Sequence, residues 1–238
     1  MILTQGAELV FKINYKKKCV MLKIIKFSFF LFLFACTISK RITTNEFVIA
    51  FGSCDNQRLV NNLWKTIDQY QPSVWIWGGD NIYCDTEDMN FLKDCYNTKL
   101  SDTTYANFIK NKLVIGTWDD HDYGVNDDGE EYPYKKESQK LFFDFMKDAQ
   151  KYTQPNREGV YYAVNLPKEN IKIIVLDTRY FRTPLTPDPD KIKRFVPSAT
   201  GTILGEEQWL WLQNELVDSK ADINLIVSSI QFLSSEHG

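Results

Sequence analysis

The stretch WIWGGDNIYCD, residues 75–85, ends an apolar run with side chains that can bind a metal ion. Asp80 offers a carboxylate that could bridge two cations, and Tyr83 could bind a ferric ion as a phenolate. Cys54 follows an earlier apolar run and would add a thiolate, which suits iron or zinc. Taken singly, Tyr83 and Cys54 are more often buried hydrophobic residues, and Gly and Asn next to Asp80 are common in turns. A metal site explains the three residues together.

A second acidic group follows the apolar run KLVIG, where residues 119–131 hold seven carboxylates. Such crowding is repulsive unless water or cations screen it. We interpret the region after the apolar run as an acidic loop, and a solvated loop accounts well for residues 127–131. It accounts poorly for residues 118–121, which include Asp120 and His121 and come directly after the apolar run. These residues are therefore candidates for the same metal site.

Two hydrolytic mechanisms fit these residues. Cys54 and His121 could form a thiol hydrolase, with a carboxylate orienting the imidazole ring. The surrounding acidic residues favour bound cations over a free thiolate, so metal-assisted chemistry explains more of the sequence. Arg179, after the apolar run IKIIVL, is a candidate phosphate clamp, and a structural ion pair explains it equally well.

The elements that must position these residues alternate between short β-rich runs and longer amphipathic ones. We expect strands within 46–54, 73–80, 112–120, 159–166, 171–181 and 223–233, helices within 61–71, 88–111, 135–150 and 205–219, and a Pro-rich loop at 183–202. This alternation predicts an α/β domain whose sheets are covered by helices. The candidate residues, with Asp177 and Gln231, follow the strands, and ligands bind at the carboxyl ends of strands in α/β sheets.

Composition limits the function classes. The chain has 238 residues and 44% hydrophobic content, which suits one substantial core and one globular domain. A formal net charge of −3 argues against a general nucleic-acid binder, because such domains carry excess Lys and Arg on one face. An anionic substrate would therefore be recognised locally.

The amino-terminal region predicts export. After Met21, Lys23 and Lys26 precede an apolar stretch at 27–35, which has the order and length of a secretory signal and is too short to span a bilayer. Residues 33–36 are similar to a bacterial lipobox in which Cys36 would be lipidated, and an ordinary signal with an incidental Cys is the alternative. Residues 1–20 add nothing that a signal needs, so we expect them to be a mis-assigned start extension, with the signal at 21–36.

Cysteine usage fits an oxidising compartment. Of five cysteines, Cys19 and Cys36 lie in the segment before the domain. Cys84 and Cys95 could pair in a disulfide, which would leave Cys54 as an unpaired thiol that needs an explanation.

The sequence resembles the PhoD-like alkaline phosphatases, a branch of the calcineurin-like metallophosphoesterases. The resemblance rests on FGSCDNQ, GGDNIYCDT, TWDDHDYGVND and IVLDTRYFR, in this order, and covers residues 46–238. The chain is also similar to purple acid phosphatases, through the Gly-Asp-x-x-Tyr pattern at 79–83 and through Asp120-His121, where those enzymes carry Asn-His.

The resemblance implies a fold and a set of metal ligands. The implied fold is an α/β sandwich of two β-sheets flanked by helices. Cys54 and Tyr83 would bind a ferric ion, Asp80 would bridge to a second metal, and Asp120 would be a ligand of that second metal. Calcium is the implied partner of iron, and manganese, magnesium or zinc occur in the wider superfamily. His121 would lie beside the scissile phosphate, and we assign Arg179 to catalysis and substrate binding and Asn81 to substrate binding.

The expected function is a secreted or membrane-anchored phosphoesterase that hydrolyses phosphate monoesters or diesters with a metal-activated hydroxide. We expect a monomer that meets a membrane only through its signal peptide or a lipid anchor. One departure matters: members of the family continue into Gly-Asp-x-His or Gly-His-x-His segments, whereas this sequence stops at Gly238. We therefore expect the carboxyl-terminal part of the domain to be missing. The alternative function is a noncatalytic, decayed or truncated exported metal-binding protein.

Overall fold

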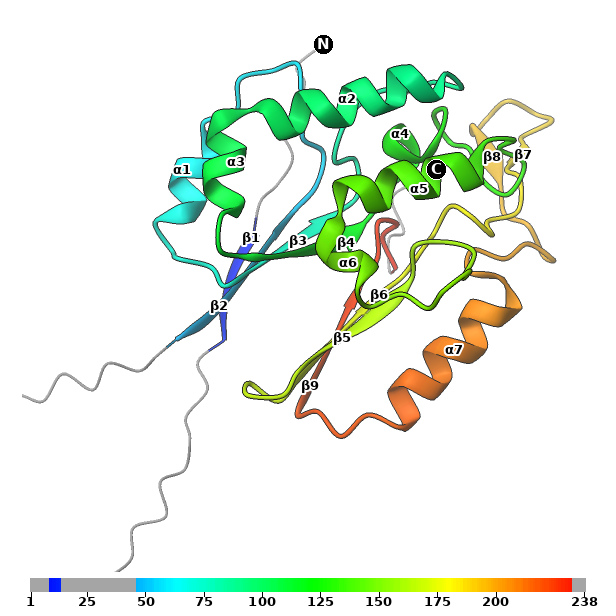
Figure 1. Cartoon of the computed structure of the whole chain (residues 1–238). Helices are drawn as coiled ribbons and strands as arrows, with labels where there is room; N and C mark the ends of the chain where they lie inside the picture. The colour runs from blue at the N-terminus through cyan, green and yellow to red at the C-terminus, as the bar shows by residue number, and fades with distance from the viewer. Residues whose placement is uncertain (1–8, 14–45, 233–238) are drawn as a thin grey trace, which may run out of the picture.

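Two β-sheets form the centre of the structure, a computed structural model that describes residues 9–13 and 46–232 (Figure 1). The strands are β1 (Leu9–Ile13), β2 (Phe47–Gly52), β3 (Val74–Gly78), β4 (Leu113–Thr117), β5 (Tyr162–Leu166), β6 (Ile171–Val175), β7 (Thr186–Pro187), β8 (Phe195–Val196) and β9 (Ile223–Val227). The helices are α1 (Leu63–Asp68), α2 (Met89–Ser101), α3 (Thr103–Ile109), α4 (Asp120–Tyr123), α5 (Lys135–Phe145), α6 (Lys147–Gln150) and α7 (Gly205–Val217).

The larger sheet has the order β1-β2-β3-β4 and positions most of the candidate residues. Strands β2, β3 and β4 are parallel, and their apolar residues are largely buried, as expected for a sheet covered on both faces. Their carboxyl ends therefore lie at one edge, where Cys54, Asp80 and Asp119 follow them. Strand β1 pairs antiparallel with β2. It lies within residues 1–20, which we interpret from the sequence as a mis-assigned start extension. The division of the chain into a start extension, a signal and a domain stays a prediction.

The smaller sheet has the order β5-β6-β9 and packs against the larger one. Strands β5 and β6 are antiparallel neighbours, and β9 runs parallel to β6. The sheets are joined by hydrogen bonds: the Tyr162 hydroxyl accepts from the Gly116 N–H at 2.8 Å, and the Thr117 hydroxyl donates to the Leu176 carbonyl at 2.7 Å. The carboxyl ends of β4 and β6 thus meet at the edge that holds the candidate residues.

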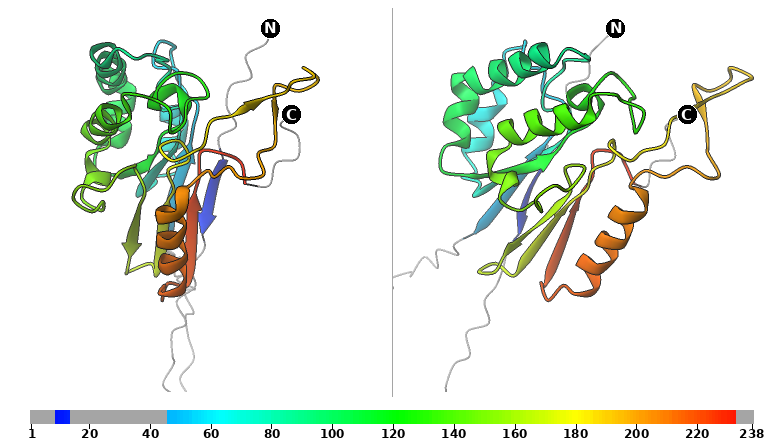
Figure 2. Two further views of the ribbon diagram at one scale, coloured as in Figure 1. Left: turned by 90° about the vertical axis from the view of Figure 1, so that its right-hand side faces the viewer. Right: turned by 45° about the vertical axis from the view of Figure 1, so that its right-hand side comes forward.

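Helices cover the outer faces of both sheets (Figures 1 and 2). On the larger sheet, Trp64 of α1 packs against Trp75 and Trp77 of β3, with ring centroids 5.2 and 5.6 Å apart. On the smaller sheet, Leu212 of α7 packs with Ile174 of β6 in a separate apolar cluster. The predicted α/β architecture of sheets flanked by helices is confirmed.

Local differences from the predicted elements have local causes. The helix expected over 88–111 is divided at Asp102, whose side chain accepts the N–H groups of Thr104 and Tyr105 and so starts α3 as a new helix. The Pro-rich loop contains the short hairpin β7–β8. The disulfide that the sequence left open is present: Cys84 and Cys95 are bonded, with Cα atoms 6.3 Å apart, and they tie the loop after β3 to α2.

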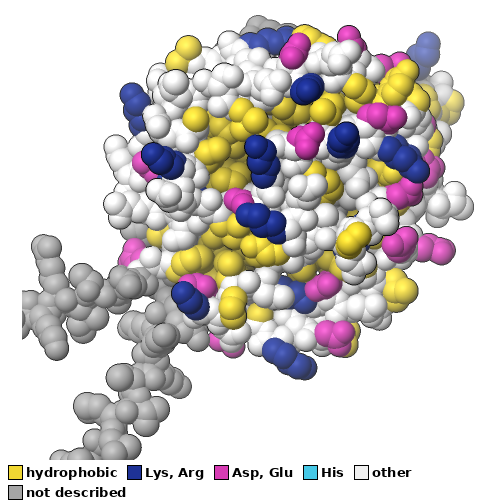
Figure 3. Space-filling model, viewed as in Figure 1, with side chains coloured by type: hydrophobic (Ala, Val, Ile, Leu, Met, Phe, Trp, Pro, Cys, Tyr) yellow, Lys and Arg dark blue, Asp and Glu magenta, His cyan; other side chains and the backbone are white. Residues whose placement is uncertain are grey.

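The surface carries mixed charge. Basic and acidic side chains are interspersed on the face seen in Figure 3. Among the described residues, no helix combines the length and apolar character that crossing a membrane requires.

Candidate metal centre

The loops after β2 and β3 are locked together at the site. The Cys54 N–H donates to the Gly79 carbonyl at 3.2 Å, and the Asp55 N–H donates to the Asp80 carbonyl at 3.0 Å. Cys54 and Asp80 both have positive φ, 62° and 51°. Non-glycine residues rarely adopt this region, and such backbone strain clusters at functional sites. Gly79 has φ of 104°, and a Cβ there would lie 2.7 Å from the Asp119 Cβ, so only glycine fits.

The structure brings three predicted metal ligands together around one carboxylate. Asp80 Oδ2 accepts from the Tyr83 hydroxyl at 3.0 Å and from the Cys54 thiol at 3.5 Å. Asp80 Oδ1 is buried and has no hydrogen-bond partner among the described residues. Leaving a buried carboxylate oxygen unsatisfied is costly, and a bound cation would satisfy it.

Asp120 and His121 complete the cluster from the start of α4. One ligand atom each from Asp80, Asp120 and His121 lie within 4.8 Å of one another. The ring of His121 packs on that of Tyr83, with centroids 4.4 Å apart. His121 Nδ1 lies 2.7 Å from Asp85 Oδ1, so this carboxylate holds the ring in place and leaves Nε2 for another partner.

Residues 120–123 form helix α4, so the interpretation of the region after β4 as an acidic loop is wrong at its start. Asp119 is the N-cap residue of α4, and its N–H donates to Asp122 Oδ1 at 2.7 Å. Asp122 is fully buried, and its other oxygen accepts from the backbone N–H and the side-chain amide of Asn81. A carboxylate is tolerated in the interior here because three N–H donors surround it.

Asn81 links the loop after β3 to β4. Its side chain is fully buried, and its amide nitrogen donates to the Thr117 carbonyl at 3.0 Å as well as to Asp122. Its Oδ1 has no partner among the described residues. The amide hydrogens of Asn81 are committed to the protein, and its role in substrate binding stays a prediction.

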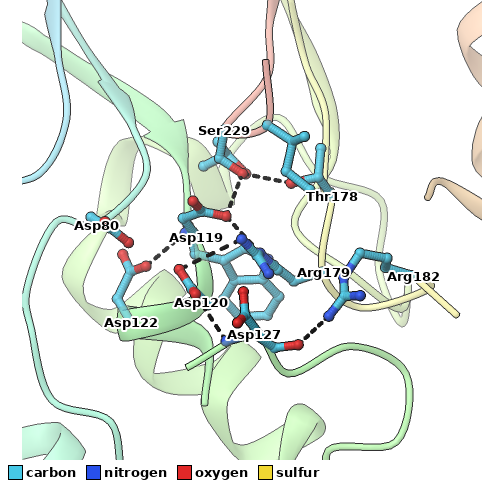
Figure 4. Close-up of polar contacts among 12 residues, drawn as sticks. Asp80, Asp119, Asp120, Asp122, Asp127, Thr178, Arg179, Arg182 and Ser229 are labelled. Atoms are coloured by element: carbon cyan, nitrogen blue, oxygen red, sulfur yellow. Dashed lines mark hydrogen bonds and ion pairs between the residues drawn. The ribbon is translucent and has the colours of Figure 1, made fainter. Parts of the chain in front are cut away.

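Arg179 lies beside the cluster in an ion pair (Figure 4). Its Nε donates to Asp119 Oδ1 at 2.6 Å, and its terminal nitrogen lies 3.5 Å from Asp120 Oδ1. The loop that carries it is fixed by buried Asp177, which accepts the backbone N–H of Arg179 at 2.8 Å and the Trp118 indole N–H at 2.9 Å. The ion pair that the sequence left open is thus present, next to a predicted metal ligand.

Burial and neighbouring carboxylates disfavour ionisation at the core of the cluster. Burial, with Asp119 as the next cause, raises the pKa of Asp80 to about 6. Burial is also the main cause of the raised pKa values of the Cys54 thiol and the Tyr83 phenol, and Asp80 adds to both. Without a cation, the phenol and the thiol therefore keep their protons, and each donates a hydrogen bond to Asp80.

Asp120 and His121 are shifted toward their charged forms. Burial opposes ionisation of Asp120, but Arg179 and the Asp127 N–H outweigh it, so its pKa is lowered. Burial likewise opposes protonation of His121, but the hydrogen bond to Asp85 and nearby carboxylates raise its pKa. The charged forms of Asp120 and His121 are thus favoured, whereas the Tyr83 phenol and the Cys54 thiol would lose their protons when a cation binds.

The donor set fits a metal ion. Carboxylate oxygens suit hard cations, whereas a thiolate and a phenolate suit iron. A Cys-His hydrolase fits less well, because Cys54 is hydrogen-bonded to Asp80 whereas His121 Nδ1 is hydrogen-bonded to Asp85. A raised thiol pKa also works against the thiolate that such an enzyme needs.

Several residues of the site were missed by sequence reasoning. Asp85, Asp122 and Ser229 each contact a predicted site residue or its neighbour, and only the adjacency of Asp122 to His121 could have pointed to one of them. Gln231, which the sequence placed at the end of a strand near the site, is exposed.

Two comparisons with known proteins give matches. A family model described as PhoD-like phosphatase matches residues 49–237. A solved structure of PhoD superposes with a TM-score of 0.60 at 19% sequence identity, over 75% of this chain. The chain spans 40% of that solved chain, and identity at this level shows the fold alone. The comparison with curated proteins finds no match.

Proposed function

The chain belongs to the PhoD-like phosphatase family, and on that premise we propose that it is a metal-dependent phosphoric ester hydrolase that acts on phosphate monoesters or diesters. The observation that carries the proposal is the convergence of Cys54 and Tyr83 on Asp80, whose second oxygen is buried and has no hydrogen-bond partner in the part of the chain that the structure describes. Such an arrangement has a physical explanation if a cation binds there, and phosphoryl transfer is chemistry that bound cations promote.

We assign the residues to two metal positions. Cys54 and Tyr83 would hold a ferric ion, Asp80 would lie between the two metals, and Asp120 would bind the second. Calcium is our first choice for the second metal because its ligands are oxygens, with manganese, magnesium or zinc as alternatives. Arg179 keeps Asp120 ionised, since it lowers the pKa of that carboxyl.

The side chains of this chain supply positioning and a proton. When bound, the cations would lower the pKa of the attacking water and withdraw charge from the phosphoryl oxygens. His121, oriented by Asp85, has Nε2 available to donate a proton to the leaving oxygen. The raised pKa of His121 keeps more of it protonated near neutral pH, which suits this role. Arg179 would bind a phosphoryl oxygen with its terminal nitrogens.

We further propose that the protein is exported and acts as a monomer outside the cytoplasm, in the periplasm, in the medium or lipid-anchored. The proposed export rests on Lys23 and Lys26 before the apolar stretch at 27–35, and Cys36 would be the lipidation site of an anchored form. These residues lie outside those that the structure describes.

Metal removal tests the proposed function. Dialysis against a chelator should lower the hydrolysis of chromogenic phosphomonoesters and diesters at least about tenfold, because the ligand cluster stays but the charge that stabilises the transition state is gone. Adding iron and calcium back should restore the rate. Undiminished turnover by protein shown to contain no metal would refute metal dependence, and no turnover of either ester by metal-loaded protein would favour a noncatalytic metal-binding protein.

Iron binding by Tyr83 has a spectroscopic test. A ferric ion bound by phenolate or thiolate absorbs visible light by charge transfer from the ligand. Tyr83→Phe should shift or remove the phenolate part of that band and leave the fold intact. Tyr134→Phe is the matched control, since this tyrosine is exposed and should leave the spectrum unchanged. A colourless, iron-free and fully active protein would rule out the ferric assignment.

A further inference from the structure

Ser229 reaches the site from the end of β9, in the smaller sheet. Its hydroxyl donates to Asp119 Oδ1 at 3.0 Å and shares a hydrogen bond with the Thr178 hydroxyl at 2.5 Å (Figure 4). Thr178 is buried and follows β6, whereas Asp119 follows β4. Ser229 therefore joins the carboxyl ends of strands from both sheets.

The same oxygen of Asp119 also accepts from Arg179. Arg179 Nε lies 2.6 Å from Asp119 Oδ1, so the serine hydroxyl and the guanidinium share one acceptor atom. The Asp119 backbone is fixed as well, because its N–H donates to Asp122. With the backbone anchored at one end and Oδ1 at the other, the carboxylate has little freedom to rotate.

Ser229 also forms part of the wall of the metal centre. A Cβ placed on Gly79 would lie 2.8 Å from the Ser229 Cβ, and Gly79 directly precedes Asp80. The serine therefore lies close to the residue that carries the central carboxylate.

We propose that Ser229 is a positioning residue that sets the orientation of Arg179 through Asp119. While Ser229 holds Oδ1, Asp119 accepts a hydrogen bond from Arg179 Nε. The terminal nitrogens of Arg179 then remain directed toward Asp120 and the phosphoryl group. Without the hydroxyl, the carboxylate can rotate and pair with those terminal nitrogens. This inference rests on the proposed function, in which Arg179 binds phosphoryl oxygens.

Adjacent serines allow a matched test. Ser229→Ala removes the hydrogen bond to Asp119. Ser228→Ala instead removes the hydrogen bond that Ser228 Oγ donates to the Ile230 carbonyl, away from Asp119. Ser229→Thr keeps a hydroxyl at the site. The metal-loaded protein is assayed for kcat and KM with a phosphomonoester, and calorimetry measures the Kd of inorganic phosphate.

Ser229→Ala should raise KM and the phosphate Kd about three- to tenfold, which is less than direct loss of a hydrogen bond to a charged group, because the effect reaches phosphate through Asp119 and Arg179. It should keep kcat within about twofold, since the metal ligands and His121 are untouched. Bound metal should be unchanged, Ser229→Thr should restore phosphate affinity, and Ser228→Ala should behave as wild type.

Equal losses in Ser229→Ala and Ser228→Ala, loss of bound metal, or a fall in kcat with unchanged phosphate affinity would overturn the positioning role. An unchanged KM and phosphate Kd would overturn it as well. Wild-type protein that binds phosphate but hydrolyses no ester would refute the proposed function instead, and the phosphate Kd of the variants would still test the role of Ser229.

Discussion

Replacing Asp80 by asparagine is expected to lower phosphate ester turnover at least about a hundredfold and to remove bound metal. Asparagine lacks the charge that offsets two cations and has one good oxygen donor in place of two. Turnover and metal content per chain measure both effects. Asp94→Asn is the control, because Asp94 is an exposed carboxylate on α2. Normal turnover by Asp80→Asn would contradict the assignment.

The same substitution should stabilise the protein when metal is absent. The pKa of Asp80 is raised to about 6 in the folded state, so stability falls as pH rises from the unfolded pKa through this value. Above pH 6 the buried ionised carboxylate destabilises the fold by up to about 3 kcal/mol, and asparagine removes this cost. Urea unfolding in chelator should show Asp80→Asn to be the more stable protein at pH 7.5 but not at pH 4. A less stable variant at pH 7.5 would show that the carboxylate serves the fold rather than the metal.

The second large effect concerns the fold of the site. Asp122→Asn should lower the free energy of unfolding by about 2–4 kcal/mol, because asparagine keeps one acceptor oxygen for three buried N–H donors. Either Asn81 or the Asp119 backbone would lose its acceptor, so the connection between the loops after β3 and β4 would weaken. Urea unfolding measures the stability, and a metal titration under native conditions measures the site.

Metal affinity distinguishes a role of Asp122 in orienting the metal ligands from a role in packing alone. Asp122→Asn should bind manganese, used as a probe ion, at least about tenfold more weakly even where it remains fully folded, as expected for a residue that orients ligands. Asp94→Asn again provides the control. Unchanged manganese affinity and unchanged stability would contradict the view that Asp122 holds the two loops together.

Sequence pattern could predict which strands end at the site. Apolar runs of strand length end just before Cys54, Asp80 and Asp119, and parallel pairing brings such ends to one edge. The pattern is easy to recognise because each of these residues comes just after an apolar run ends. The cluster of predicted ligands around Asp80 follows from this regularity and from the resemblance to metallophosphoesterases.

The residues that orient the ligands could not be predicted in this way. Ser229 meets Asp119 across 110 positions of sequence, and the contact depends on the packing of two sheets. Asp122 was grouped with acidic residues of a loop because composition cannot distinguish a solvated carboxylate from one surrounded by buried N–H donors. The partner of His121 depends on the path of the loop after Tyr83, which no periodic pattern fixes.

The most direct test of the metal-centred account is to count bound metal and measure ester turnover in the same samples of Asp80→Asn and Cys54→Ser. The account predicts that Asp80→Asn loses metal and activity together. Cys54→Ser should bind iron more weakly but retain part of both, since the other ligands remain. A thiol nucleophile replaced by serine would instead fail almost completely. If Asp80→Asn keeps its metal and its rate, while Cys54→Ser and the alkylated wild-type protein are inactive, the metal-centred mechanism is wrong.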